Sequence, residues 1–89
     1  MTTTPRPAVA WFADQVEAAL QRNDAKPHWG DLTILQLLDK LCEEVGELHD
    51  AAIFGDPARV QAEAADVAAC ALFLADVFRA TPSRDRGRA

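Results

Sequence analysis

Two pairs of acidic residues have the spacing that places both carboxylates of a pair on one face of an α-helix. Glu44 and Glu47 form the first pair, and Glu63 and Asp66 form the second. At about 100° per residue, Glu44 and Glu63 fall inside apolar stripes, whereas Glu47 and Asp66 fall at the edges. The apolar residues that define these stripes are Leu37, Leu41, Leu48, Ala51, Val60, Val67, Cys70 and Leu74. Two helices are therefore predicted to carry acidic pairs on faces that should be buried.

Buried carboxylates need a compensating charge or a proton, because burying one unpaired costs several kcal/mol. Lys40 precedes Glu44 by one helical turn and is a candidate partner for it. Four carboxylates without a histidine or cysteine favour a hard divalent cation, Mg²⁺ or Mn²⁺. A di-iron site is disfavoured because His49 follows Gly46, rather than an acid, by three residues. The alternative is that these are ordinary solvated acids on alanine-rich helices.

The apolar periodicity predicts three helices that would position these pairs. The predicted bounds are residues 7–21, residues 34–54 and residues 57 to about 79. The last helix is apolar on nearly every side and must be covered on more than one face. Because its connection to the second helix is short, the two should lie antiparallel and bring the acidic pairs face to face.

Local signals mark the ends of the second helix. Thr33 and Gln36 fit a capping box at its start, and Leu32 can pack onto Leu37 as a hydrophobic staple. At its end, the sequence FGDP has a glycine that suits the C-terminal stop of this helix. The aspartate that follows suits the N-cap of the third helix, and the proline suits its first position. The helical hairpin is thus predicted from both of its termini.

The composition fits one small all-α domain spanning residues 1–89, with residues 1–6 and 81–89 expected to be flexible. The net charge of -5 and the lack of a basic stripe argue against nucleic-acid binding. Neither a membrane span nor a signal peptide is expected. Cys42 and Cys70 are interpreted as reduced core thiols of a cytoplasmic protein. We expect an antiparallel bundle of about three helices, completed by oligomerisation as a homodimer or homotetramer.

The acidic residues also form a pattern that resembles a known family. Glu43-Glu44-Val45-Gly46-Glu47, followed after residues 48–62 by Glu63-Ala64-Ala65-Asp66, is similar to the signature of the MazG-like all-α nucleoside triphosphate pyrophosphohydrolases. The similarity extends roughly over residues 29–77. It implies helical bundles that assemble as dimers or dimers of dimers. It also implies Mg²⁺-dependent hydrolysis of nucleoside or deoxynucleoside triphosphates to the monophosphate and pyrophosphate.

The resemblance also implies roles for individual residues. The metal ligands would be Glu44, Glu47, Glu63 and Asp66. Glu43, Glu44 and Glu47 are the candidate catalytic residues, with Glu43 either supporting the ligands or acting as a general base. Lys40 and Trp29 are the candidate substrate-binding residues: Trp29 could stack on a nucleotide base, or it could close the end of the bundle.

Two other functions remain open from the sequence. One is a non-catalytic helical module that oligomerises or binds a metal. The other is a hydrolase or binder of a different phosphorylated nucleotide, such as an alarmone. Gly46 leaves a similar choice, because a glycine within a helix either permits close approach of a neighbouring helix or is simply tolerated.

Overall fold

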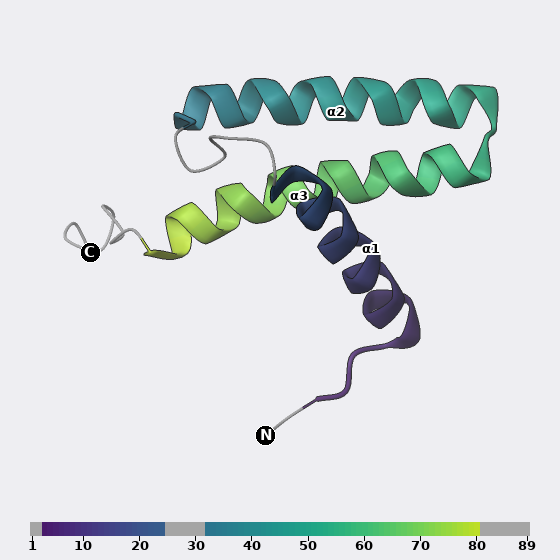
Figure 1. Ribbon diagram of the computed structural model, residues 1–89, viewed down its shortest axis with the longest axis horizontal. Coiled ribbons are helices and arrows are strands. Elements are labelled where there is room, and N and C mark those ends of the chain that lie inside the picture. The colour runs from purple at the N-terminus through teal and green to yellow at the C-terminus, as the bar shows by residue number, and fades with distance from the viewer. Residues whose placement is uncertain (1–2, 25–31, 81–89) are drawn as a thin grey trace, which may run out of the picture.

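The computed structural model describes residues 3–24 and 32–80. Within these ranges the chain forms three α-helices and no strand: α1 (Pro7–Asp24), α2 (Ile34–Phe54) and α3 (Pro57–Ala80) (Figure 1). The all-helical fold and the predicted bounds of the second and third helices are confirmed to within one residue. Trp29 and residues 81–89, for which we made predictions above, lie outside the described residues.

The ends of α2 are stabilised as the sequence predicted. The Thr33 side chain accepts a hydrogen bond of 3.1 Å from the Gln36 amide, and the Gln36 side chain accepts one of 2.8 Å from the Thr33 amide. This reciprocal capping box satisfies two amides that would otherwise lack a partner at the helix start. At the other end, Gly55 has a left-handed backbone with φ of 70°, and its amide donates to the carbonyls of Ala51 and Ala52.

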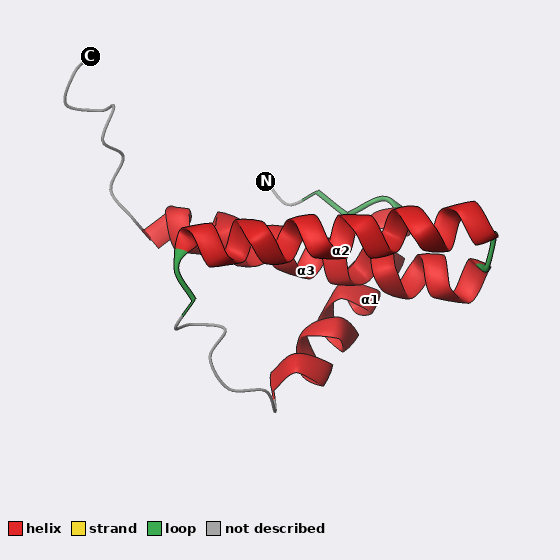
Figure 2. Cartoon of the chain, turned by 90° about the horizontal axis from the view of Figure 1, so that it is seen from above, coloured by secondary structure: helices red, strands yellow, loops and turns green. Residues whose placement is uncertain are grey.

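The turn after Gly55 makes α2 and α3 an antiparallel pair. Asp56 caps α3 through its side chain, which accepts a hydrogen bond of 3.3 Å from the Arg59 amide. The two helices contact each other and lie side by side along most of their length in Figure 1, and α2 lies over α3 in the view from above (Figure 2). The predicted helical hairpin is confirmed, and the faces that carry the two acidic pairs can therefore meet.

The first helix crosses α3 obliquely and does not align with the hairpin. Within the described residues, α1 contacts α3 but not α2 (Figure 2). Ala19 of α1 and Ala65 and Ala69 of α3 are buried at the crossing. Small side chains there let the two backbones approach closely, and larger residues pack around them. These flanking residues are Phe12, Val16 and Leu20, all on α1.

Helix α1 continues to Asp24, beyond the predicted end at Gln21. The Asn23 side chain donates a hydrogen bond of 2.9 Å to the Ala19 carbonyl and so satisfies an acceptor in the last turn. Arg22 is the basic residue of that turn, where a positive charge interacts favourably with the helix dipole. The longer helix therefore holds Arg22 on the same side as Ala19, facing α3.

A second apolar stripe runs along the face of α2 that points away from α3. Its members are exposed and span roughly 80° of the helix circumference, opposite Glu44; they are Leu35, Leu38, Cys42 and Val45. The prediction that Cys42 is a core thiol is wrong for this reason, whereas Cys70 is buried as predicted. None of the helices in the described ranges has the length and apolarity of a membrane span.

Candidate metal centre

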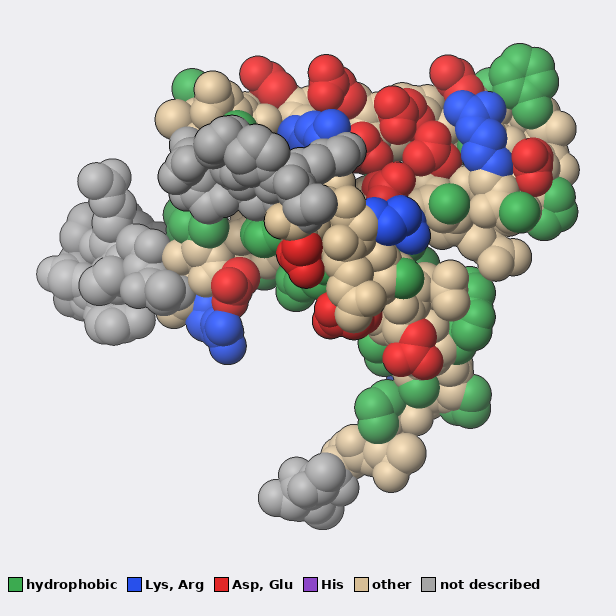
Figure 3. Space-filling view, in the orientation of Figure 1, with side chains coloured by type: hydrophobic (Ala, Val, Ile, Leu, Met, Phe, Trp, Pro, Cys, Tyr) green, Lys and Arg blue, Asp and Glu red, His purple; other side chains and the backbone are tan. Residues whose placement is uncertain are grey.

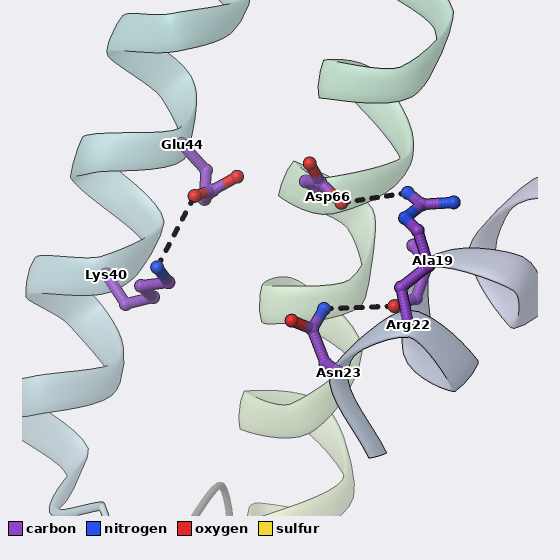
Figure 4. Close-up of polar contacts among 6 residues, drawn as sticks. All are labelled: Ala19, Arg22, Asn23, Lys40, Glu44 and Asp66. Carbon is purple, nitrogen blue, oxygen red and sulfur yellow. Dashed lines mark hydrogen bonds and ion pairs between the residues drawn. The ribbon is translucent and has the colours of Figure 1, made fainter. Parts of the chain in front are cut away.

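Glu44 is the one buried charged residue among those described, with 7% of its surface exposed. It lies in the middle of α2 between Leu37 and Ala51, which are also buried on the face against α3. The Lys40 Nζ lies 3.6 Å from Glu44 Oε1, which confirms Lys40 as a partner of this acid (Figure 4). The helical phase that placed Glu44 inside the apolar stripe is therefore correct.

Three carboxylates meet between α2 and α3. Glu44, Glu63 and Asp66 each offer an oxygen, and these oxygens all lie within 4.8 Å of one another. Glu63 and Asp66 are partly buried on α3, directly across from Glu44. We call these three residues the acidic trio. The expectation that acids from the two helices lie face to face is confirmed for three of the four residues.

The remaining acidic candidates, Glu43 and Glu47, are exposed on α2 and lie outside the trio. Glu47 falls at the edge of the apolar stripe, where a glutamate can reach solvent. Its charge nevertheless acts on the trio, since it raises the pKa of both Glu44 and Glu63. Glu47 is therefore an electrostatic neighbour of the trio in this arrangement.

Crowding of the acids shifts their protonation equilibria. Burial is the largest cause that raises the pKa of Glu44, followed by the charge of Glu47, and Lys40 opposes the rise. Burial is also the largest cause for Glu63, followed by the charges of Glu47, Asp66 and Glu44, and Arg59 opposes the rise. Both carboxylates thus hold protons more tightly than free glutamate, and a divalent cation would favour their ionised forms.

Each member of the trio has a basic partner. Lys40 pairs with Glu44, and Arg22 Nη2 lies 3.4 Å from Asp66 Oδ1 (Figure 4). Arg59 Nη2 lies 3.9 Å from Glu63 Oε2. In the space-filling view, basic side chains lie among the acids that gather over α2 and α3 (Figure 3). These three basic side chains thus offset much of the negative charge that would otherwise destabilise the hairpin.

Two of these partners were missed from the sequence. Arg59 precedes Glu63 by four residues, the same spacing as Lys40 and Glu44, so helical spacing alone was enough to find it. Arg22 lies 44 residues before Asp66 and on another helix. No local pattern links such residues; the contact follows from the oblique crossing of α1 at Ala19, Ala65 and Ala69.

The donor set of the trio fits a hard divalent cation. Oxygens on opposite sides of Mg²⁺ are about 4.2 Å apart, since each lies about 2.1 Å from the ion. Only one pair among three ligand oxygens can lie on opposite sides of the ion, and the other pairs lie about 3.0 Å apart at right angles. The oxygens of the trio, which lie within 4.8 Å of one another, would therefore draw closer together around one cation. Cys70 is buried nearby, and its thiol pKa is raised by burial first and by the Glu44 charge second, so it remains a neutral thiol. An oxygen-only set disfavours soft metals.

Comparison of the chain with protein-family models, with curated proteins and with solved structures gives no significant match. A functional assignment therefore rests on the acidic trio, on its basic partners and on the residue pattern of α2 and α3.

Proposed function

We propose that this chain is a Mg²⁺-dependent hydrolase that converts nucleoside or deoxynucleoside triphosphates to the monophosphate and pyrophosphate. The observation that carries the proposal is the acidic trio, whose oxygens lie within 4.8 Å of one another on two antiparallel helices. The pattern from Glu43 to Asp66, which resembles that of the MazG-like pyrophosphohydrolases, supports the choice of reaction. Mn²⁺ is the alternative cation, because it accepts the same oxygen ligands.

In this proposal the trio binds the cation between the helices. Glu44 is buried on one helix, and Glu63 and Asp66 are partly buried on the facing helix, so the three carboxylates already lie near one another before the cation binds. Bound there, a divalent cation polarises the phosphoryl oxygen and lowers the pKa of a nearby water molecule. Glu47 is exposed on α2, its charge acts on Glu44 and Glu63, and it is proposed as a fourth ligand or as the group that orients water.

The remaining candidates would act on the water and the nucleotide. Glu43 is exposed on α2, where it can accept a proton without being a ligand. Lys40 adjoins Glu44, and its ammonium is proposed to contact a phosphate once a cation neutralises that carboxylate. Trp29 stays a candidate for stacking on the base.

The proposed active form is a homodimer or homotetramer. The apolar stripe of α2, formed by Leu35, Leu38, Cys42 and Val45, gives a surface on which a second copy can pack. Large apolar residues of α3 are exposed as well; these are Leu72, Val77 and Phe78. An assembly that covers them would bury more than one face of α3, as a helix that is apolar on nearly every side requires.

A non-catalytic, cation-binding helical module is the second candidate. The observation that favours it is the basic partner beside each member of the trio. Such pairs stabilise a fold without any chemistry. Under this alternative the protein binds Mg²⁺ without turnover of any nucleotide, which separates the two candidates experimentally.

The test is hydrolysis in ¹⁸O-labelled water across a panel of ribo- and deoxyribonucleoside triphosphates, with Mg²⁺ or with a chelator. Water that attacks the α-phosphorus breaks its bond to the bridging oxygen, and pyrophosphate leaves with the electron pair. We expect the label in the monophosphate, pyrophosphate before orthophosphate, and no turnover with the chelator. Label in pyrophosphate, or release of orthophosphate with a diphosphate, would overturn the proposal. A folded protein that hydrolyses none of the substrates in the panel would overturn it as well.

A further inference from the structure

Arg22 differs from the other basic partners of the trio because its helix, α1, contributes no carboxylate to the trio. Lys40 and Arg59 are each four residues from the acid that they neutralise, on the same helix. Arg22 instead comes from α1 and reaches Asp66 on α3. Its position is fixed by the crossing of α1 over α3, one helical turn from the buried Ala19.

The contact between Arg22 and Asp66 is weak for an ion pair. The distance from Arg22 Nη2 to Asp66 Oδ1, 3.4 Å, is longer than the roughly 2.7–2.9 Å of a strong charge-assisted hydrogen bond. The Arg22 side chain is 56% exposed, and an exposed pair of this kind adds little stability. A guanidinium has five N–H donors in a planar fork, and within residues 3–24 and 32–80 the guanidinium of Arg22 donates only from Nη2 to Asp66.

A divalent cation would compete directly with Arg22 for Asp66. If Asp66 binds a cation between α2 and α3, its charge is neutralised and its hold on the guanidinium weakens. The exposed guanidinium of Arg22 would then be released beside Asp66, as a donor for phosphate oxygens that complete the coordination of the cation. The planar fork of arginine matches two phosphate oxygens better than the point charge of lysine does.

We propose that Arg22 is a substrate-binding residue, which leaves Asp66 when the cation binds and then contacts the phosphate chain of the nucleotide. This inference rests on the proposed function and deepens it. It predicts that cation and polyphosphate bind in a coupled manner: the cation releases Arg22, and the released guanidinium increases affinity for the anion.

The test measures binding rather than turnover, on the full chain. Inorganic tripolyphosphate serves as the anion because it carries the phosphate chain without a base. Binding of Mn²⁺ alone is followed by electron paramagnetic resonance, and binding of tripolyphosphate to the Mn²⁺-loaded protein by calorimetry. Arg22→Gln removes the charge but keeps the stem, Arg22→Lys keeps the charge without the fork, and circular dichroism checks that both fold.

Arg79→Gln is the matched control. Arg79 is also an exposed arginine in an ion pair, with Asp76 on the same helix. It follows Asp66 by thirteen residues on α3, about 20 Å along the helix axis. Removing its charge changes the net charge of the chain as Arg22→Gln does, but away from the trio.

We expect Arg22→Gln to bind Mn²⁺ at least as tightly as wild type and tripolyphosphate about ten- to a hundredfold more weakly. Arg22→Lys should restore part of the anion affinity, and Arg79→Gln should bind both as wild type does. Wild-type affinity of Arg22→Gln for tripolyphosphate would overturn the role of Arg22 while leaving the proposed function intact. Failure of the wild-type protein to bind Mn²⁺ would overturn both.

Discussion

Lys40 and Glu44 lie one turn apart on α2, with the ammonium nitrogen 3.6 Å from a carboxylate oxygen of the most buried acid described. The geometry sets a basic side chain where a divalent cation is proposed to bind. Without the cation, Lys40 is therefore the main compensation for the charge of Glu44. With the cation bound, the same ammonium is no longer needed for stability.

Lys40→Met should destabilise the cation-free protein by about 1 kcal/mol, because the Lys40 side chain is part exposed while Glu44 is buried. Urea unfolding in the presence of a chelator measures this loss. Saturating Mg²⁺ should remove most of the difference, since the cation then offsets the charge of Glu44. An equal loss with and without Mg²⁺ would contradict a cation beside Glu44.

Alanine substitution of a proposed ligand should abolish turnover while leaving the fold intact or more stable. The substitutions are Glu44→Ala, Glu47→Ala, Glu63→Ala and Asp66→Ala. We expect each to lower kcat at least about a hundredfold, because the cation supplies several kcal/mol of charge stabilisation in the transition state. Stability in chelator should not fall, since removing one acid relieves repulsion within the cluster.

Glu43→Ala is the matched control on the same helix, because Glu43 is exposed and lies outside the trio. It should reduce kcat less than any substitution in the trio. Initial rates at saturating Mg²⁺ rank the effects of these substitutions on kcat. A larger effect at Glu43 than at Glu44 would mean that the buried face of α2 is not the functional one.

Stability of the cation-free protein should fall as the pH rises from mildly acidic to neutral. The pKa values of Glu44 and Glu63 are raised above their ordinary 4.5 in the folded protein, chiefly by burial. Between 4.5 and the raised values, the folded state binds more protons than the unfolded state, so acidification stabilises it. Above the raised pKa values, these two groups no longer change the free energy of unfolding with pH.

Urea midpoints at about pH 5 and about pH 7.5 in chelator test this dependence. The double variant Glu44→Gln, Glu63→Gln should lose the excess stability at the lower pH, which separates these acids from the other titrating groups. Saturating Mg²⁺ should reverse the trend in the wild-type protein, because the cation binds ionised carboxylates and competes with protons. If the double variant showed the same pH dependence of stability as the wild-type protein, Glu44 and Glu63 would not be its source.

The protein should be a dimer or tetramer at micromolar concentration. The apolar stripe of α2, Leu35, Leu38, Cys42 and Val45, is exposed along one face of the helix. Light scattering measures the mass, and the pair of substitutions Leu35→Lys and Val45→Lys should shift it to the monomer. Gln61→Lys, on the exposed surface of α3, is the control and should not change it. A folded wild-type monomer would contradict the prediction.

Gly46→Ala should stabilise the monomeric hairpin by about 1 kcal/mol, the usual difference between these residues within a helix. A Cβ built at Gly46 meets no heavy atom within 4 Å, so α3 does not approach it closely. Urea unfolding of the monomeric double variant above, with and without Gly46→Ala, isolates this effect. A loss of stability would contradict it.

The hairpin and two of the three basic partners were accessible from sequence because the relevant signals are local. Capping residues specify the ends of α2, and spacings of three and four residues specify which acids and bases share a face. Glu44, Glu63 and Asp66 were predicted together because the short turn at Gly55 fixes how α2 and α3 are paired.

The rest depended on contacts between distant parts of the chain. The crossing of α1 over α3 is set by small residues that fit together at Ala19, Ala65 and Ala69, and periodicity gives a face but not a crossing direction. The partner role of Arg22 follows from that crossing and was missed. Cys42 was misassigned because an apolar position on a helix was taken as a core position, although it faces away from α3.

The turn at Gly55 and Asp56 also sets the order in which the charges meet while the chain folds. Contacts between α2 and α3 near this turn close short loops, whereas Arg22 and Asp66 are 44 residues apart. The hairpin should therefore form early and bring the acids together before α1 docks. Lys40 and Arg59, on the same helices as the acids they neutralise, should limit the repulsion in the folding transition state, and Arg22 should contact Asp66 only after that state has been passed. Divalent cations should accordingly speed folding, and loss of Arg22 should chiefly speed unfolding.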